Sequence, residues 1–321
     1  SSPIPTPHVL PSMGTLASPP TTAQRWWTYQ RERFPLAAHL PLIAVFSLSA
    51  LLHSAWLRTG SAHLGWADAA GAVGLAFGFF LLLRIADEFK DAAKDAAHRP
   101  YRPVPRGLVS LRELGAVGVV TAALQLIIAL ALGPGVTVVL LIGWAYFGLM
   151  TVEFFVPTWL EARASLYMAS HMLILPLIAL TVTACDWAGA DAVPPLSLGW
   201  FLAATYASGL GLELGRKIRA PEDEEPGVQT YSVRWGRRGA VGAWCVALTG
   251  AAGLAVVAAH QVDAGGWTAL VSLPLVAAAW GVGLRFLREP TSNTAAAIEP
   301  LAGLGFLTVH ACMGVLPLVV G

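Results

Sequence analysis

The chain has 321 residues, of which 56% are hydrophobic and 12% are charged, and its formal net charge is +1. A soluble domain is typically about half apolar and about a quarter charged. This composition therefore excludes an ordinary water-soluble domain and indicates a protein that lies mostly within a lipid bilayer, and we expect no nucleic-acid partner.

The first 24 residues differ from the rest of the chain. They are rich in Pro, Ser and Thr and contain no apolar core. We therefore predict a disordered tail over residues 1–24 and no cleavable signal peptide. Residues 25–321 form a single transmembrane domain in this interpretation.

Nine apolar runs follow, and each is close to the length of about 20 residues that an α-helix needs to span a bilayer. They cover approximately residues 36–57, 65–85, 114–132, 136–156, 165–184, 197–214, 239–259, 266–286 and 300–320. The alternating pattern of membrane-spanning strands is absent, and helices satisfy their own backbone hydrogen bonds in lipid. We predict an all-α, polytopic membrane protein with about nine transmembrane helices in one bundle.

The positive charges are distributed unevenly between the two faces of this predicted bundle. When alternate loops are assigned to opposite faces, 19 of the 20 Lys and Arg residues fall on the N-terminal face, and Arg58 alone lies opposite. Loops rich in Lys and Arg remain in the cytoplasm. The sequence therefore predicts a cytoplasmic N-terminus and cytoplasmic loops after the second, fourth, sixth and eighth spans.

The second span runs into a charged segment, DEFKDAAKD, at residues 87–95. Asp87, Asp91 and Asp95 are four residues apart, which places them in one stripe along a helix. Stacked like charges destabilise a helix, and a Mg²⁺ ion held by one or two carboxylates together with phosphate oxygens would remove this repulsion. The alternative is a solvated helix end in which Lys90 and Lys94 pair with Asp87 and Asp91.

A proline-rich segment, RPYRPVPRG, follows at residues 99–107. Its prolines predict an extended, stiff loop that holds Arg99, Arg102 and Arg106 beside the carboxylates. Arginine recognises phosphate with two parallel hydrogen bonds, so this combination suits a diphosphate group on an apolar tail. The alternative is a set of arginines that only fixes the topology or contacts lipid headgroups.

A second charged segment follows the sixth span and should reach the same face. We expect its helix to continue to Pro221, because the residue before a proline avoids the helical conformation. The carboxylates that we consider as ligands of a second metal ion are Glu213, Glu222 and Asp223. The cations expected to contact phosphate are Arg216, Lys217 and Arg219. The alternative is an amphiphilic loop at the membrane interface.

Two further residues are candidates for an acceptor site. His171 lies within the fifth span, where it could orient or deprotonate an acceptor or simply be a packed, buried histidine. Glu153 lies near the end of the fourth span, and carboxylates inside a membrane are costly and usually functional.

The two charged segments resemble the signature of the UbiA-type intramembrane prenyltransferases. DExxDxxxD at 87–95 and RPxRPxPxG at 99–107 are similar to the NDxxDxxxD motif and the RPxRPxPSG-like loop of that family. Asp87 stands where the family has Asn, Glu88 where it has Asp, and Arg106 where it has Ser. Arg33 resembles the arginine that precedes the family's first helix, and Arg163 resembles a basic residue in its loop after the fourth helix.

The end of the second segment, with Glu222, Asp223, Gly227 and Thr230, resembles the family's second acidic motif. This chain departs from that motif because Arg219 occupies one acidic position and Glu213 is out of register by about one residue.

The resemblance implies specific roles for the residues of both segments. The first Mg²⁺ site would consist of Asp87, Glu88, Asp91 and Asp95. A modified second site would consist of Glu213, Glu222 and Asp223. The diphosphate would be held chiefly by Arg102, Arg163, Arg216 and Lys217.

Three functions are compatible with these patterns. The first is a prenyltransferase that uses Mg²⁺ to ionise an isoprenoid diphosphate and joins the prenyl group to a lipophilic acceptor, which could be aromatic. The second, prompted by the altered acidic motifs, is a terpene cyclase of the same superfamily that needs no acceptor. The third is a transporter whose acids relay protons or bind ions, although transporter sites tend to lie near the bilayer midplane.

Overall fold

A computed structural model describes residues 20–188, 190 and 192–320, and the regular structure of this part of the chain is entirely helical. Most of the predicted tail lies outside the described residues. Its last residues belong to α1 (Thr22–Arg33), an additional helix that we did not predict, and the side chain of Thr21 caps the start of this helix. The N–H of Gln24 donates to the Thr21 hydroxyl, and the Gln24 side chain accepts from the Thr21 N–H.

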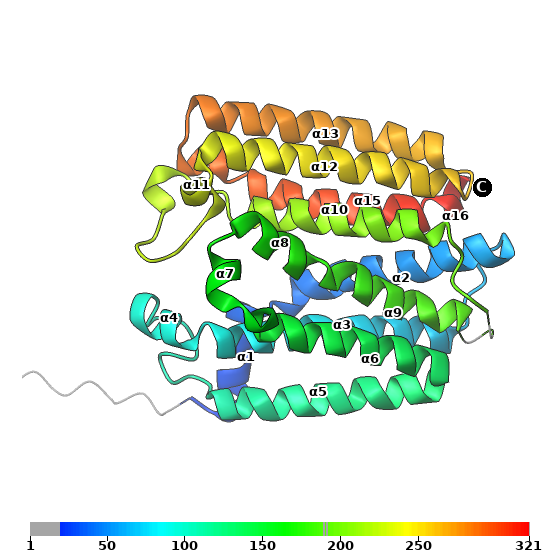
Figure 1. The fold of residues 1–321 in the computed structure, drawn as a ribbon, viewed down its shortest axis with the longest axis horizontal. Helices are drawn as coiled ribbons and strands as arrows, with labels where there is room; N and C mark the ends of the chain where they lie inside the picture. Colours follow the sequence, from blue (N-terminus) through cyan, green and yellow to red (C-terminus); the bar gives the residue numbers. More distant parts are fainter. Residues whose placement is uncertain (1–19, 189, 191, 321) are drawn as a thin grey trace, which may run out of the picture.

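The long helices lie side by side along the long axis of the molecule (Figure 1). They are α2 (Leu36–Thr59), α3 (Trp66–Lys90), α5 (Leu111–Leu132), α6 (Pro134–Thr151), α8 (Ala164–Met172), α9 (Ile174–Trp187), α10 (Leu198–Arg216), α12 (Gly236–His260), α13 (Gly265–Arg288) and α15 (Ile298–Gly314). The short elements are α4 (Ala92–His98), η1 (Glu153–Phe155), α7 (Pro157–Glu161), η2 (Pro221–Asp223), α11 (Tyr231–Arg234), α14 (Ser292–Ala295) and α16 (Pro317–Val320). The predicted all-α, polytopic membrane class is confirmed.

Eight segments of the described chain are long and apolar enough to cross a membrane, rather than the nine that we expected. The predicted sixth span is α10, which falls short of the mean hydropathy of the others. Helix α10 packs between α12, α15 and α9, and it buries small or polar residues there: Thr205, Ser208, Gly209 and Gly211. Small residues allow close helix packing in membranes, so the interior position of α10 explains its lower apolarity.

The fifth span, expected to be one helix over 165–184, is divided at Leu173 into α8 and α9. Pro176 has no N–H to donate to the carbonyl of Met172, and a proline at this position breaks a helix. The hydroxyl of Tyr146 donates to the carbonyl of Ser170 at 2.5 Å, which satisfies one of the acceptors near the break.

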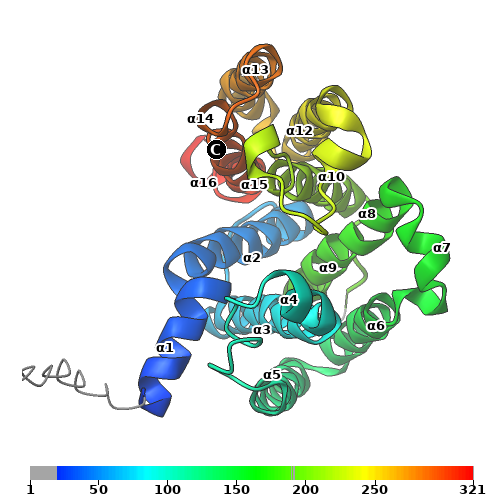
Figure 2. The same cartoon turned by 90° about the vertical axis from the view of Figure 1, so that its left-hand side faces the viewer.

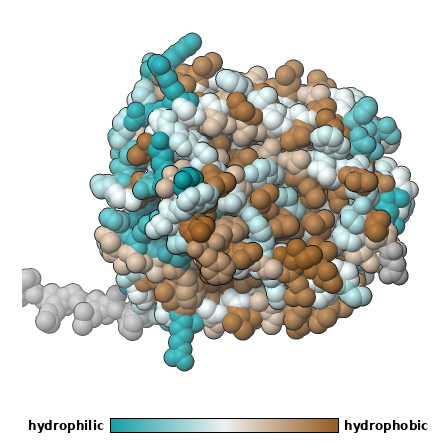
Figure 3. Space-filling view, in the orientation of Figure 1, coloured by the Kyte–Doolittle hydropathy of each residue, from teal (hydrophilic) through white to brown (hydrophobic). Residues whose placement is uncertain are grey.

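Most of the charged side chains gather at one end of the bundle (Figure 3). The space-filling view shows hydrophilic residues at the end that carries α1, α4, α7 and α11, and a hydrophobic surface along the helices (Figures 1 and 3). Arg58 lies at the opposite end, where its Nη2 is 2.7 Å from Oδ1 of Asp186. The uneven distribution of positive charge that the sequence predicted is therefore present in the fold.

Candidate functional site

The two charged segments meet at this hydrophilic end. Nε of Arg99, just after α4, donates to Oε2 of Glu225 at 2.9 Å. Gly227 adopts a left-handed φ of +79°, and a Cβ atom on it would lie 2.6 Å from the imidazole of His98. Figure 2, which looks onto this end, shows α4 beside the loop between α10 and α11. The chain thus brings together two motifs that are far apart in the sequence.

The first acidic segment keeps its helical spacing, although α3 ends at Lys90 and α4 begins at Ala92. The N–H of Asp91 donates to the carbonyl of Asp87 at 2.9 Å, and the N–H of Asp95 donates to the carbonyl of Asp91 at 2.8 Å. The four carboxylates differ in exposure, because Glu88 and Asp95 are buried, Asp91 is half-buried and Asp87 is exposed.

Glu88 is the buried counter-ion of two arginines. Its Oε1 lies 2.5 Å from Nε of Arg33 and 3.3 Å from Nη2 of Arg84, and its side chain is 1% exposed. The hydroxyl of Tyr29 is buried nearby, and burial together with the negative charge of Glu88 raises the pKa of this tyrosine. Arg33, predicted to contact substrate, therefore connects α1 to α3 through Glu88.

Asp95 is likewise engaged by the arginine loop. Nη1 of Arg102 donates to its Oδ2 at 2.6 Å, and Nη1 of Arg99 lies 4.0 Å from its Oδ1. Arg106 points elsewhere, because its Nη2 donates to Oε1 of Glu32 in α1 at 2.8 Å.

The prediction of an extended loop at 99–107 was wrong. The segment forms successive turns, in which Arg102 N–H donates to the Arg99 carbonyl and Leu108 N–H to the Pro103 carbonyl. Proline fixes the φ that the second residue of a turn requires, so the prolines here shape turns. The left-handed Gly107 ends the series with φ +75°.

The second charged segment leaves the helix earlier than we expected. Helix α10 ends at Arg216 and does not reach Pro221. The backbone that follows α10 is held by the start of α11. The carbonyl of Lys217 accepts from the Tyr231 N–H at 3.2 Å, and the Arg219 N–H donates to Ser232 Oγ at 2.9 Å. In the last turn, Nζ of Lys217 lies 2.5 Å from Oε1 of Glu213.

Glu222 and Asp223 both bind Ser292 at the start of α14. Oε1 of Glu222 accepts from the Ser292 N–H at 2.7 Å, and Oδ1 of Asp223 accepts from the Ser292 hydroxyl at 2.8 Å. The donated hydrogen bond of the Ser292 N–H lowers the pKa of Glu222. In this structure, these two predicted metal ligands join the second segment to α14.

The remaining predicted cations lie near the surface of the same end. Arg163 stacks on Trp159, with 4.3 Å between the guanidinium and the ring centroid. Nη1 of Arg219 lies 3.7 Å from Oε2 of Glu299. Arg216 is exposed and lies within electrostatic range of the Asp87 carboxylate.

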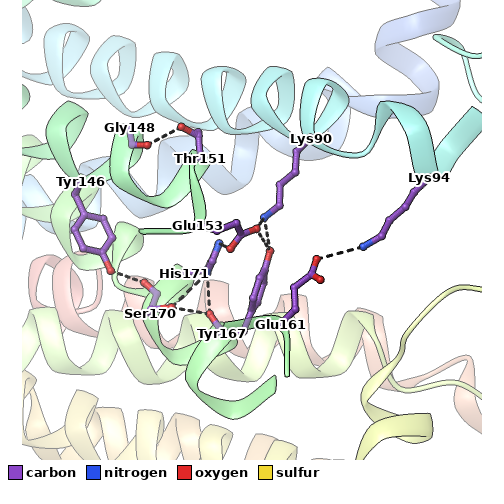
Figure 4. A network of polar contacts seen from close by, with 10 residues as sticks. All are labelled: Lys90, Lys94, Tyr146, Gly148, Thr151, Glu153, Glu161, Tyr167, Ser170 and His171. Atoms are coloured by element: carbon purple, nitrogen blue, oxygen red, sulfur yellow. Dashed lines mark hydrogen bonds and ion pairs between the residues drawn. The ribbon is translucent and has the colours of Figure 1, made fainter. Parts of the chain in front are cut away.

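His171 belongs to a network around the buried carboxylate of Glu153 (Figure 4). Lys90 forms an ion pair with Oε1 of Glu153 and also contacts the Tyr167 hydroxyl, which donates to the same Oε1 at 3.0 Å. Nε2 of His171 lies 3.3 Å from Oε2 of Glu153. The imidazole stacks on the Tyr167 ring at 4.0 Å, and its Nδ1 lies 2.9 Å from the Tyr167 carbonyl.

The backbone that carries Glu153 is strained. The three residues of η1 all have left-handed φ values, which are 50° for Glu153, 51° for Phe154 and 62° for Phe155. Each such residue costs about 1–2 kcal/mol unless it is glycine. Strain of this kind persists where the surroundings determine the conformation, and it is concentrated at functional sites.

Sequence reasoning did not identify the partners that organise this end of the bundle. It missed Arg84 and Tyr29 beside Glu88, and it missed Lys90 and Tyr167 as partners of Glu153. Arg84 could have been found, because it lies one helical turn before Glu88. Lys90 and Lys94 pair with Glu153 and Glu161 rather than with Asp87 and Asp91.

The carboxylates of the first segment provide a donor set that fits Mg²⁺. Within residues 20–188, 190 and 192–320, no three His, Cys, Asp or Glu side chains lie close enough together to hold a metal ion. Mg²⁺, however, usually takes one or two carboxylates and completes its shell with waters and substrate phosphates. Asp87 and Asp91 suit this mode, since the ion pair of Asp87 with Arg84 is long, at 3.8 Å.

Comparisons with known proteins support the relation that the motifs indicated. The fold is similar to that of a digeranylgeranylglyceryl phosphate synthase, with a TM-score of 0.62, 14% identity, and coverage of 92% of this chain and 99% of the other. It is also similar to a UbiA homologue from Aeropyrum pernix K1, with a TM-score of 0.58, 18% identity, and coverage of 82% and 96%. No curated protein sequence matches the chain. The sequence model of the UbiA prenyltransferase family matches residues 38–307, and the chain belongs to this family of multi-pass membrane proteins.

Proposed function

We propose that the chain is a membrane prenyltransferase that uses Mg²⁺ to ionise an isoprenoid diphosphate and transfers the prenyl group to a lipophilic acceptor. The observation that carries this proposal is the meeting of the two motifs, joined by Arg99 and Glu225 at the hydrophilic end of an apolar bundle. A diphosphate on a long hydrocarbon chain needs this division between a charged end and an apolar body.

Asp87 and Asp91 would hold the metal ion in this proposal. When bound, Mg²⁺ would neutralise part of the charge that develops on the leaving diphosphate. Arg216 and Lys217 at the end of α10 would bind the phosphate oxygens, and Arg163 could join them from the loop after α7. Glu88 would act indirectly, because its ion pairs with Arg33 and Arg84 fix the end of α3.

The reaction would break the bond between the prenyl carbon and the diphosphate oxygen, and the electron pair would leave with the diphosphate. An electron pair of the acceptor would then form the new bond to the prenyl carbon, and the acceptor would lose a proton. The allylic cation must be protected from water. Tyr167, Phe154 and His171 form an aromatic group beside the charged end, and aromatic faces stabilise cations.

We further propose that the hydrophilic end faces the cytoplasm. This orientation is supported by the positive-inside rule, because 19 of the 20 Lys and Arg residues belong to this end. The metal ion and the water-soluble diphosphate product would then exchange with the cytoplasm.

Product analysis tests the proposed reaction and separates it from cyclisation. The purified protein in lipid nanodiscs would be supplied with Mg²⁺ and either farnesyl or geranylgeranyl diphosphate, with and without a lipid extract as the source of acceptor. We expect a prenylated lipid that forms only with the extract. A terpene hydrocarbon or alcohol released without the extract would identify a cyclase, which the departures at Glu213 and Arg219 keep under consideration. Family membership favours either reaction over transport.

Asp91→Asn should abolish formation of the product. Asp263→Asn is the matched control, because Asp263 lies at the opposite end of the bundle and its left-handed φ of 58° suits asparagine. Equal activity of the two variants would contradict the assignment of Asp91.

A further inference from the structure

Lys90 lies next to the carboxylates of the first segment but does not pair with them. It is three residues after Asp87 on α3, and residues three apart on a helix are neighbours. An ammonium group at this position would be expected to pair with Asp87. Lys90 instead extends toward η1, where it forms an ion pair with Glu153 and contacts the Tyr167 hydroxyl (Figure 4).

Glu153 is a stronger partner for this cation than Asp87. The side chain of Glu153 is 9% exposed, whereas that of Asp87 is 59% exposed. Attraction between opposite charges is larger where water is excluded, and exposed ion pairs contribute little. The Tyr167 ring adds to the attraction, because its centroid lies 4.9 Å from Nζ of Lys90.

The strained backbone of η1 presents Glu153 to Lys90. Three successive left-handed residues are unfavourable in a chain without glycine at these positions, so the contacts of the segment must maintain them. The Tyr167 hydroxyl donates to Oε1 of Glu153 at 3.0 Å. This hydrogen bond orients the carboxylate in addition to its ion pair with Lys90.

This arrangement matters for Asp87 and Asp91, to which the proposed function assigns the metal ion. An ammonium group and a divalent cation bind the same carboxylate oxygens, so Lys90 would compete with the metal if it were free to turn. Its ion pair with Glu153 prevents that competition.

We propose that Glu153 is a positioning residue that holds Lys90 away from Asp87 and Asp91 and so keeps these carboxylates available to a divalent metal ion. The inference rests on the proposed function. Glu153 acts through Lys90 and touches neither the metal nor the substrate.

Metal binding without substrate provides the test. Wild-type protein, Glu153→Gln, Lys90→Met and the double variant would be titrated with Mn²⁺ in nanodiscs, and free Mn²⁺ would be measured by electron paramagnetic resonance. Glutamine keeps the shape of the side chain and can still accept from Tyr167. We expect Glu153→Gln to weaken Mn²⁺ binding about tenfold. The ammonium group of Lys90, no longer paired with residue 153, would turn toward Asp87 and Asp91 and compete with the metal ion for their oxygens. Lys90→Met should bind as the wild type does, and the double variant should recover wild-type affinity.

Glu161→Gln is the matched control. It removes the partner of Lys94, but this pair is 3.6 Å apart and both side chains are more than half exposed. Such a pair is weak, so Mn²⁺ binding should not change. Thermal unfolding of the same proteins distinguishes competition from misfolding, because competition requires that Glu153→Gln is still folded at the temperature of the Mn²⁺ titration.

The possible outcomes separate this inference from the proposed function. Wild-type protein that fails to bind Mn²⁺ in the absence of substrate would overturn the positioning role, whereas the proposed function is overturned only by absence of Mg²⁺-dependent diphosphate release. Binding by wild type together with equal binding by Glu153→Gln would overturn the positioning role alone. A double variant that binds as weakly as Glu153→Gln would also overturn the positioning role and leave the proposed function intact.

Discussion

Arg99 and Glu225 are joined by a hydrogen bond of 2.9 Å although 126 residues separate them in the sequence. The bond connects the loop after the first acidic motif to the loop that carries the second. Gly227 packs on His98 beside it. The convergence of the two motifs therefore rests on a contact of the Gly227 backbone with His98 as well as on the ion pair of Arg99 with Glu225.

Gly227→Ala should lower stability by about 1–3 kcal/mol, because it adds a Cβ atom at a left-handed φ and forces that atom into the His98 ring. Thermal unfolding followed by tryptophan fluorescence would measure the change. Gly107→Ala is the control, since Gly107 has a similar φ of +75° but nothing lies within 4 Å of the added atom. The contact with His98 is unimportant if both variants lose the same stability.

Glu88 and Asp87 should respond differently to neutralisation. Glu88→Gln leaves Arg33 and Arg84 without their shared buried counter-ion, and breaking a buried ion pair costs about 3–5 kcal/mol. Asp87→Asn alters an exposed carboxylate and should leave the unfolding temperature unchanged while diphosphate release falls. Unfolding scans and diphosphate release, measured on both variants, test this division. The opposite pattern would show that Glu88 holds the metal.

Arg216→Gln should weaken binding of inorganic diphosphate by about ten- to a hundredfold, since a hydrogen bond to a charged group contributes about 1.5–3 kcal/mol. Isothermal titration calorimetry with diphosphate and Mg²⁺ would measure the affinity. Arg238→Gln is the control, because it removes one positive charge at another exposed position of the hydrophilic end. If the two variants lose affinity equally, the effect is one of net charge rather than of a contact by Arg216.

The bond from Ser292 to Glu222 predicts a pH dependence of stability. The Ser292 N–H lowers the pKa of Glu222 below the usual range of a glutamate in the folded protein. A carboxyl group with a lowered pKa stabilises the fold above its unfolded pKa, and this contribution is lost as the pH falls through the folded pKa. Unfolding temperatures measured between neutral and acidic pH should therefore fall less steeply for Glu222→Gln than for the wild type. Parallel curves would contradict the contact.

The class of fold could be predicted from the sequence because a helix that contacts lipid needs a long run of apolar residues. Helix α10 was predicted in the same way, although it is less apolar than the other spans because it is buried between other helices rather than in contact with lipid. The break between α8 and α9 follows from Pro176, whose missing N–H is visible in the sequence. The early end of α10 was not predictable, since it depends on Tyr231 and Ser232 of α11.

The site was predictable in its residue types but not in its pairing. Helical spacing placed Asp87, Asp91 and Asp95 in one stripe. The same spacing suggested that Lys90 would pair with Asp87, whereas its partner is Glu153, 63 residues away on a strained turn that contains no glycine. Competition between a local and a distant carboxylate is decided by burial, which spacing along one helix does not reveal.

Release of diphosphate is the most direct measurement of the central claim that this charged end ionises a prenyl diphosphate. Folded protein in nanodiscs, supplied with farnesyl or geranylgeranyl diphosphate, with a lipid extract and with Mg²⁺, should release inorganic diphosphate, and chelation of Mg²⁺ with EDTA should stop the release. A protein with a normal unfolding transition that releases no diphosphate from either substrate, whatever the Mg²⁺ concentration, would contradict the claim.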